Sequence, residues 1–295
     1  VYKRQNILEN IDVHDGMAIG FYLVKGMNNL VLNCDAHDNY DGYSEGDSGN
    51  VDGFGGHANK ETSTGNIFRG CRAWNNGDDG FDLINCYASY IIEYCWSFRN
   101  GYKPHSIESS GGNGAGFKSG GYGMGDIKKV PNPIPQHTVR YCLAYYNRQQ
   151  GFYSNHHLGG LIFENNTAYK NPSNYNMLNR KSSNEAVDVP GYGHIIKNNL
   201  SLSPRNSGGF PQHLINVDNT LSEIKNNSFA PNDLNLSESD FESLNEQELM
   251  GSRKSDGSLP DINFLRLTNH ANFRFSGMGL SLIHISEPTR LRRIS

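Results

Sequence analysis

The sequence contains no apolar run long enough to cross a membrane as a helix, which argues against a membrane-spanning protein. An excess of basic residues is also missing. The formal net charge is −4 and the pI is near 6.3, which argues against nucleic acid as the main partner. Long amphipathic helical runs are almost absent, and no cysteine has the CxxC or CxxH spacing of a zinc site. Glycine, asparagine and tyrosine are plentiful instead, which indicates short strands joined by many turns.

The two terminal segments differ in character from the rest of the chain. The first five residues read VYKRQ, and residues 280–290 read LSLIHISEPTR. Back-translated, both resemble parts of a sequencing adapter, so we exclude Val1–Gln5 and Leu280–Ser295 from the expected fold. We accordingly expect the natural N-terminal coils, and any signal peptide, to be missing from this sequence.

A nine-residue pattern recurs along the chain, and each copy begins with alternating apolar and polar residues, the period of a strand. A cysteine or asparagine occupies the fourth position of every copy. The clear copies are Val31–Asn39, Phe68–Asn76, Ile92–Asn100, Val139–Asn147 and Phe163–Asn171, and the weaker ones are Ile196–Pro204 and Ile224–Asn232. A regular repeat with irregular insertions is the signature of a solenoid, because each unit buries too little surface to fold alone.

A Gly-Phe pair marks the same repeat. Its phenylalanines are Phe21, Phe54, Phe81, Phe117 and Phe152. Leucine-rich and helical repeats are disfavoured, since neither LxxLxL spacing nor amphipathic helices occur. We therefore predict an all-β fold, a right-handed parallel β-helix, over residues 6–232. The phenylalanines should form one internal column. A second column should contain Cys34, Cys71, Cys95 and Cys142, followed by Asn166, whose amide can bond to the next coil.

The five cysteines and the C-terminal tail follow from this register. Four cysteines occupy equivalent positions, so buried stacking is favoured over disulfides, although a secreted protein leaves disulfides open. Residues 233–279 form a tail in which Ser237–Met250 has a possible N-cap and near-helical apolar spacing. We predict a short helix there, then an extended segment through Leu265 packed on the solenoid. A disordered acidic linker is the alternative.

Alignment on the Gly-Phe pair predicts the chemistry. The residue after Phe points outward because the phenylalanine points inward, and on adjacent coils this residue is Asp82 and then Lys118. The residue before Gly is Asp52 on one coil and Asp79 on the next, and Asp78 adjoins Asp79. Four carboxylates should therefore converge beside one lysine. Such a cluster of hard oxygen ligands favours Ca²⁺. A solvated turn and a plain Lys118–Asp82 ion pair are the alternatives.

Three segments carry a closer resemblance. NVDGFGGH (Asn50–His57), NNGDDGFDL (Asn75–Leu83) and GNGAGFKSGG (Gly112–Gly121) resemble motifs of polysaccharide lyase family 9, a family of right-handed parallel β-helix pectate lyases and relatives. The resemblance extends from Asn6 to about Asn272. It implies that Lys118 is the Brønsted base and that Asp52, Asp78, Asp79 and Asp82 bind calcium. His57 departs from the pattern, because a less bulky or lysine-type residue is expected there, and it could alter substrate fit.

The implied reaction is β-elimination on a pectic galacturonan. Calcium would acidify the C5 proton beside the uronate carboxylate, Lys118 would remove it, and 4,5-unsaturated oligogalacturonides would form. Homogalacturonan (pectate or polygalacturonate) is the preferred substrate in this interpretation, and rhamnogalacturonan is the alternative. Two other classes are a β-helical glycoside hydrolase with paired carboxylates and a non-catalytic carbohydrate-binding or adhesin solenoid. Only a lyase would form an unsaturated product.

Several expectations complete the sequence-based hypothesis. Arg148, Asn155 and His156 lie on or near the coil after Lys118 and are candidate substrate-binding residues, with ordinary loop polarity as the alternative. Insertions at Gly101–Ala115 and Ser119–Gln136 are predicted to wall the groove. We expect a monomer that acts outside the cell, either secreted, periplasmic or at the cell surface, with an acidic polysaccharide as its partner.

Overall fold

The computed structural model places a short strand at almost every position where the repeat predicts one. The structure describes residues 5–43, 49–122, 130–205, 212–229, 234–268 and 278–279. The predicted segments Val1–Gln5 and Leu280–Ser295 therefore lie outside the described residues, apart from Gln5. Among the described residues, no helix is long and apolar enough to span a membrane.

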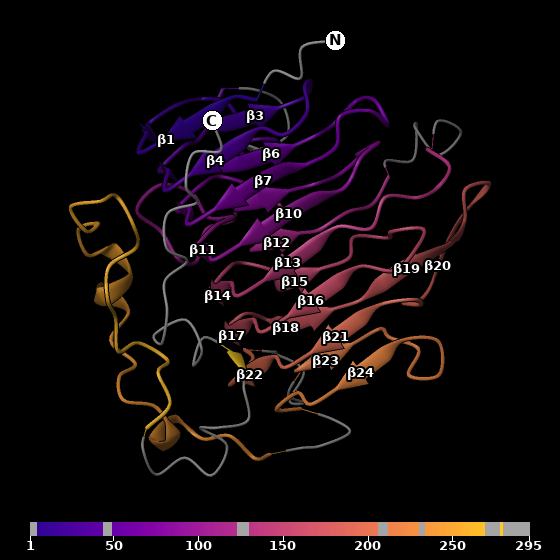
Figure 1. Cartoon of the computed structure of the whole chain (residues 1–295). Helices are drawn as coiled ribbons and strands as arrows, with labels where there is room; N and C mark the ends of the chain where they lie inside the picture. Colours follow the sequence, from indigo (N-terminus) through magenta and orange to yellow (C-terminus); the bar gives the residue numbers. More distant parts are fainter. Residues whose placement is uncertain are drawn as a thin grey trace.

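Three parallel sheets run along the molecule, and each coil contributes one strand to each sheet, except the last coil, whose described residues form a strand in one sheet only (Figure 1). Sheet A contains β1 (Ile7–Glu9), β4 (Leu30–Leu32), β7 (Asn66–Arg69), β10 (Tyr90–Glu93), β13 (Thr138–Arg140), β16 (Ile162–Glu164), β21 (Ile195–Lys197) and β24 (Glu223–Lys225). Sheet B contains β2 (Asp12–His14), β5 (Asp35–His37), β8 (Arg72–Trp74), β11 (Trp96–Phe98), β14 (Leu143–Tyr145), β17 (Thr167–Tyr169) and β22 (Leu200–Leu202). Sheet C contains β3 (Phe21–Leu23), β6 (Phe54–Gly56), β9 (Phe81–Asp82), β12 (Phe117–Lys118), β15 (Gln150–Tyr153), β18 (Ser173–Asn176) and β23 (Leu214–Ile215). The predicted parallel β-helix is confirmed.

The predicted phenylalanine column forms the centre of the core. Phe54 stacks on Phe81 with ring centroids 4.7 Å apart, and Phe81 stacks on Phe117 at 4.9 Å. The stack continues through Phe152 to Tyr175, again at 4.9 Å per step. These separations equal the spacing between neighbouring strands, so each ring repeats the position of the ring below it.

The second predicted column is also present. All five cysteines are free and buried, so the structure contains the stack rather than disulfides. The backbone N–H of Cys142 donates to Asn166 Oδ1 at 3.0 Å, and the Asn166 amide donates to Asn199 at 3.1 Å. The asparagine amides thus satisfy the backbone of the preceding coil and each other, as their position at the turn predicts.

The tail lies along the outer face of sheet B, at the edge of the view in Figure 1. Phe264 packs edge-on against Tyr145, with ring centroids 5.2 Å apart. Arg72 anchors the tail by donating to the carbonyl oxygens of Leu249 and Gly251 at 3.1 and 2.8 Å. The described part of the tail therefore packs on the outer face of sheet B.

The predicted tail helix takes a different form. It consists of two short 3₁₀ helices, η2 (Glu238–Asp240) and η3 (Glu246–Met250), separated by extended residues. Phe241, which lies between the two helices in the sequence, forms an antiparallel bridge with Leu267. That bridge, together with burial of Phe241 against sheet B, holds the chain extended where a continuous helix was expected.

One antiparallel hairpin was not predicted. It comprises β19 (Leu178–Ser182) and β20 (Glu185–Pro190), which project from the solenoid beside sheet C (Figure 1). The backbone N–H of His156 donates to the carbonyl oxygen of Leu178 at 2.9 Å, which ties the hairpin to the coil that follows Lys118.

Candidate cation and catalytic site

Sheet C brings the charged residues together as the alignment predicts. Strand β9 pairs with β12 so that Phe81 lies opposite Phe117 and Asp82 lies opposite Lys118. The phenylalanines are fully buried in the core, so the next residue of each strand points to the outer face. The predicted adjacency of Asp82 and Lys118, 36 positions apart in the sequence, is confirmed by this pairing.

Three carboxylates converge at this point. Among the described residues, Asp52, Asp79 and Asp82 each offer an oxygen within 4.8 Å of the other two. All three are nearly inaccessible to solvent, with exposures of 2%, 0% and 4%. Burying like charges so closely is unfavourable unless cationic groups compensate them.

The pKa values of the cluster reflect this cost. Burial raises the pKa of Asp52 well above its ordinary value, and the charges of Asp82 and Asp79 raise it further. Burial also raises the pKa of Asp79, although Lys118 opposes this shift. Backbone donors stabilise the charged forms in part. Asp79 N–H donates to Asp52 Oδ1 at 3.1 Å, and Ile84 N–H donates to Asp82 Oδ1 at 2.7 Å.

Lys118 is the cationic group that the chain itself supplies. Its Nζ donates to Asp79 Oδ2 at 3.0 Å and to Asp82 Oδ2 at 3.1 Å. Burial opposes the charged ammonium, but the nearby carboxylates outweigh burial and raise the pKa of Lys118 above its ordinary value. In this arrangement Lys118 is a counterion. It can act as a base only when another cation balances Asp79 and Asp82.

Asp78 occupies a different position from its three predicted partners. It is not part of the group of converging oxygens, and its Oδ1 accepts the backbone N–H groups of Asn113 and Gly114. Burial, followed by the charge of Asp79, raises the pKa of Asp78 to about 7. Asp78 therefore fixes the end of the insertion Gly101–Ala115 beside the cluster, and its role as a metal ligand stays a prediction.

The donor set fits a hard divalent cation. Three buried carboxylates are the ligand chemistry that calcium prefers, and one lysine cannot balance three or four of them. His57 adds a further observation, since its Nε2 is buried, has no hydrogen-bond partner among the described residues and lies 3.8 Å from Asp82 Oδ2. Burial lowers the pKa of His57, which favours a neutral ring beside the cluster.

The three candidate substrate-binding residues make contacts within the protein. Arg148 Nη1 donates to the carbonyl oxygens of Gly112 and Asn113 at 2.8 and 3.2 Å, which holds the insertion in place. Asn155 is 9% exposed and donates to Gly120 O at 2.8 Å. His156 lies between Tyr153 and Asp188. A direct role of these residues in binding substrate stays a prediction.

Two residues near Lys118 were missed from the sequence. Tyr153 follows Lys118 in the outward column of sheet C, because β12 pairs with β15 in register. Its place in the column was readable from the Gly-Phe alignment, but a tyrosine signals no particular chemistry. Asp188 is on β20, outside the repeat, so nothing in the repeat indicates that it approaches His156.

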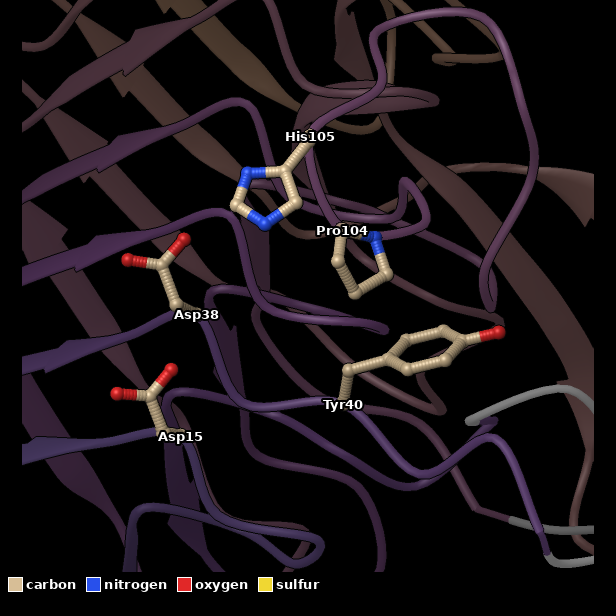
Figure 2. A pocket seen from close by; sticks show the side chains of 5 residues that line it. All are labelled: Asp15, Asp38, Tyr40, Pro104 and His105. Carbon is tan, nitrogen blue, oxygen red and sulfur yellow. The ribbon is translucent and has the colours of Figure 1, made fainter.

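A separate hollow of about 470 Å³ is lined by Asp15, Asp38, Tyr40, Pro104 and His105 (Figure 2). Both carboxylates there already have partners. Asp15 Oδ2 lies 2.6 Å from His14 Nδ1, and Asp38 contacts His37 at 2.7 Å and the Asn75 amide at 3.0 Å. The hollow contains none of the predicted site residues.

Known proteins resemble this chain over most of its length. Residues 1–229 match the family described as "Pel9A-like, right handed beta helix region", and residues 218–293 match "Rhamnogalacturonan lyase-like, C-terminal". Pectate lyase L of Dickeya chrysanthemi is 35% identical over 282 residues, which cover 95% of this chain and 59% of that protein. Pectate lyase PEL9 of Emericella nidulans is 29% identical and is covered over 63% of its length. The chain thus spans about 60% of these curated relatives.

Two solved structures agree with the observed architecture. A structure described as rhamnogalacturonan lyase is 54% identical with a TM-score of 0.85, and the match covers 93% of this chain and 66% of that one. The pectate lyase Pel9A is 33% identical with a TM-score of 0.73, and the match covers 91% of this chain and 59% of that one. The chain therefore belongs to the Pel9A-like family of right-handed parallel β-helix proteins, polysaccharide lyase family 9.

Proposed function

We propose that this protein cleaves a pectic polysaccharide by calcium-dependent β-elimination. The observation that carries the proposal is the buried cluster of Asp52, Asp79 and Asp82 beside Lys118 on the outer side of sheet C. A uronate polymer bears repeated negative charges, so an acidic face attracts it only through a bridging cation. The family membership supports the same reaction class, and we also propose that the protein acts outside the cell, where pectic polymers occur.

Rhamnogalacturonan is the substrate that we propose. The homogalacturonan preference drawn from the sequence has support from the relatives named as pectate lyases. The alternative has stronger support, because the relative named as a rhamnogalacturonan lyase shares more residues and a closer backbone with this chain. The match of the tail to a rhamnogalacturonan lyase-like C-terminal region adds to it. A pectate lyase activity is the second candidate.

Each residue of the cluster has a distinct role in this proposal. Asp52, Asp79 and Asp82 would hold calcium, and Asp78, the fourth predicted ligand, would also fix the neighbouring insertion. Bound calcium would balance these carboxylates and make the C5 proton of the uronate more acidic. Lys118 Nζ would accept that proton as its amine, since its present partners Asp79 and Asp82 would then no longer stabilise the ammonium.

The test is a screen of pectic polymers for the ultraviolet absorbance of the C4–C5 unsaturated product. Rhamnogalacturonan and polygalacturonate are assayed in parallel, each with excess chelator and after calcium is restored. We expect product from rhamnogalacturonan, loss of activity in chelator and recovery with calcium. Reducing ends without the absorbance would indicate a hydrolase, binding without cleavage would indicate an adhesin, and full turnover after verified metal removal would exclude calcium.

A further inference from the structure

A chain of three side chains connects the projecting hairpin to the outward column of sheet C. Tyr153 Oη lies 2.9 Å from His156 Nε2, and His156 Nδ1 lies 2.6 Å from Asp188 Oδ1. Both ring nitrogens of His156 are therefore engaged, one by a phenol and the other by a carboxylate. The sequence-based hypothesis gave no role to Tyr153 or Asp188.

The backbone holds these three residues in place. Asn155 and His156 both have left-handed φ angles of 54° and 57°, which turn the chain so that the imidazole returns to the tyrosine three residues earlier. The rings of Tyr153 and His156 meet edge to face, with centroids 5.9 Å apart. Asparagine and histidine adopt left-handed φ values more readily than most residues other than glycine, so both residue types suit this turn.

Tyr153 is the neighbour of Lys118 on the next coil. Strands β12 and β15 pair so that Lys118 lies opposite Tyr153, and both side chains are partly exposed on the same face. Adjacent coils are about 4.8 Å apart. In a galacturonate ring the C5 proton and the C4 oxygen project from opposite faces, so the base and the proton donor must be two separate groups that reach the ring from different sides.

Elimination requires a proton as well as a base. When the C4–O4 bond breaks, the departing sugar oxygen acquires an electron pair, and a poor leaving group of this kind benefits from a proton donor. The pKa of Tyr153 is raised to about 12 by burial and by Asp188, so the phenol keeps its proton at neutral pH. Tyr153 thus holds a proton on the coil next to that of Lys118.

We propose that Tyr153 is the general acid of this site, and that His156 and Asp188 are its positioning residues; the inference rests on the proposed lyase function. The C5 proton passes to the Lys118 amine, and its bonding pair forms the C4–C5 double bond. The C4–O4 bond breaks, and O4 takes the proton of Tyr153 Oη. The phenolate regains a proton from His156 Nε2, solvent water reprotonates the imidazole, and Lys118 returns its extra proton to water.

The hydrogen-bond directions agree with this role when both ring nitrogens of His156 carry protons. Nδ1–H then donates to Asp188, which as a carboxylate can only accept. Nε2–H donates to the phenol oxygen, which leaves the hydroxyl proton of Tyr153 free to point at the substrate. A histidine that donates to the phenol also stabilises the phenolate formed in the transfer.

The test compares two leaving groups. Tyr153→Phe is assayed on the polysaccharide and on a galacturonoside that carries a para-nitrophenoxy group at C4. This group leaves as para-nitrophenolate, which needs no protonation. We expect kcat on the polysaccharide to fall by about 10²–10⁴-fold, and kcat on the activated substrate to fall by less than about tenfold. An equal loss on both substrates, or turnover on the polysaccharide close to wild type, would overturn the assignment.

Further variants separate this role from a structural one. His156→Gln and Asp188→Asn should show the same selective loss to a smaller degree, with unchanged melting temperatures, and they test the assignment should Tyr153→Phe not fold. Tyr141→Phe, which removes a phenol that stacks on Tyr94 away from this site, should retain both activities. Lys118→Ala should lose activity on both substrates. If wild-type protein forms no unsaturated product at all, the proposed function fails, whereas equal losses with an active wild type refute only Tyr153.

Discussion

Two columns of side chains run along this solenoid and illustrate opposite uses of the same repeat. The buried asparagine ladder contains Asn39, Asn76, Asn100, Asn147 and Asn171, one at the end of each clear copy of the nine-residue pattern. The outward column of sheet C contains instead Tyr22, Gly55, Asp82, Lys118 and Tyr153. Both columns have the same strand spacing, but they differ in residue type and in whether the side chains point into the core or outward.

The ladder repeats a neutral group that complements itself. Each amide donates to the oxygen of the next at 2.9 to 3.1 Å, and the residues are completely buried. Stacking a charged group in that way would be costly, and the outward column avoids it by changing residue from coil to coil. The repeat therefore stabilises the fold where it is kept, and it brings charged residues together where it is broken.

The largest expected effect comes from Lys118, where the outward column departs furthest from the ladder. Lys118→Arg keeps a cation that can still pair with Asp79 and Asp82, but arginine cannot release a proton near neutral pH. We expect turnover to fall by about 10²–10⁴-fold, with calcium binding and melting temperature retained. The measurement is the initial rate of formation of unsaturated product at saturating calcium.

Lys118→Ala is the companion variant. It should lose turnover to at least the same extent, while it also removes the counterion of Asp79 and Asp82. If the arginine variant kept about a tenth or more of wild-type turnover, Lys118 would not be the base, and that role would have to be assigned to another residue.

The ladder should respond in stability rather than in chemistry. Asn100 Oδ1 accepts from the Asn76 amide at 2.9 Å and from the Asn76 backbone N–H at 3.1 Å, and the Asn100 amide donates to Asn147 at 3.0 Å, so Asn100→Ala removes buried hydrogen bonds on both sides. We expect a loss of about 2–4 kcal/mol in the free energy of unfolding, measured by urea denaturation. The kcat of the remaining folded protein should be close to wild type. A stable variant with low kcat would contradict the expectation that the ladder contributes to stability and not to catalysis.

The carboxylate cluster should respond with the opposite sign. Asp52→Asn removes one buried charge, and its amide oxygen can still accept the Asp79 N–H that now bonds to Asp52 at 3.1 Å. Without calcium we expect the variant to be about 1 kcal/mol more stable than wild type, because a costly like charge is gone.

Calcium provides the second half of that test. Wild-type protein should gain stability as calcium is added, since the ion binds only the folded state, and Asp52→Asn should gain much less. Thermal unfolding with and without calcium measures both quantities. Equal stabilisation of the two proteins by calcium would remove Asp52 from the ligand set.

The sequence predicts these features unequally, for physical reasons. The Phe column and the Asp82–Lys118 pair follow from strand register alone, and the repeat fixes that register. The position of Asp78 does not follow, because it depends on the insertion that supplies the N–H groups of Asn113 and Gly114. The position of Asp188 is even harder to predict, since this residue belongs to a hairpin outside the repeat. Columns are readable from the sequence, whereas contacts made by insertions are not.

The smallest expected effect concerns a third column, at the start of the strands of sheet A. Histidine and asparagine side chains there both accept a hydrogen bond from the backbone of a neighbouring coil. Asn66 Oδ1 accepts the backbone N–H of Asn29 at 3.0 Å, and His137 Nδ1 accepts that of Tyr90 at 3.0 Å. His194 Nδ1 accepts the N–H of Leu161 in the same way. His137→Asn should preserve the bond and also remove the buried Nε2 that has no partner among the described residues. At neutral pH we expect the free energy of unfolding to change by less than about 1 kcal/mol.

At acidic pH the free energies of unfolding of wild type and His137→Asn should differ. Burial, with a further contribution from His157, lowers the pKa of His137 well below its ordinary value, so the ring is neutral in the folded state. As pH falls below about 6.5, the unfolded chain binds a proton that the folded chain does not, and stability is lost. His157 and His194, with pKa values lowered by burial to about 4 and about 3, add to this loss in both proteins. His137→Asn removes one such proton, so its stability should fall less steeply, by about 1.4 kcal/mol per pH unit between roughly pH 6 and pH 4. Urea unfolding across that range measures the slope. Identical slopes would mean that His137 is already protonated when folded, which its acceptor bond from Tyr90 does not allow.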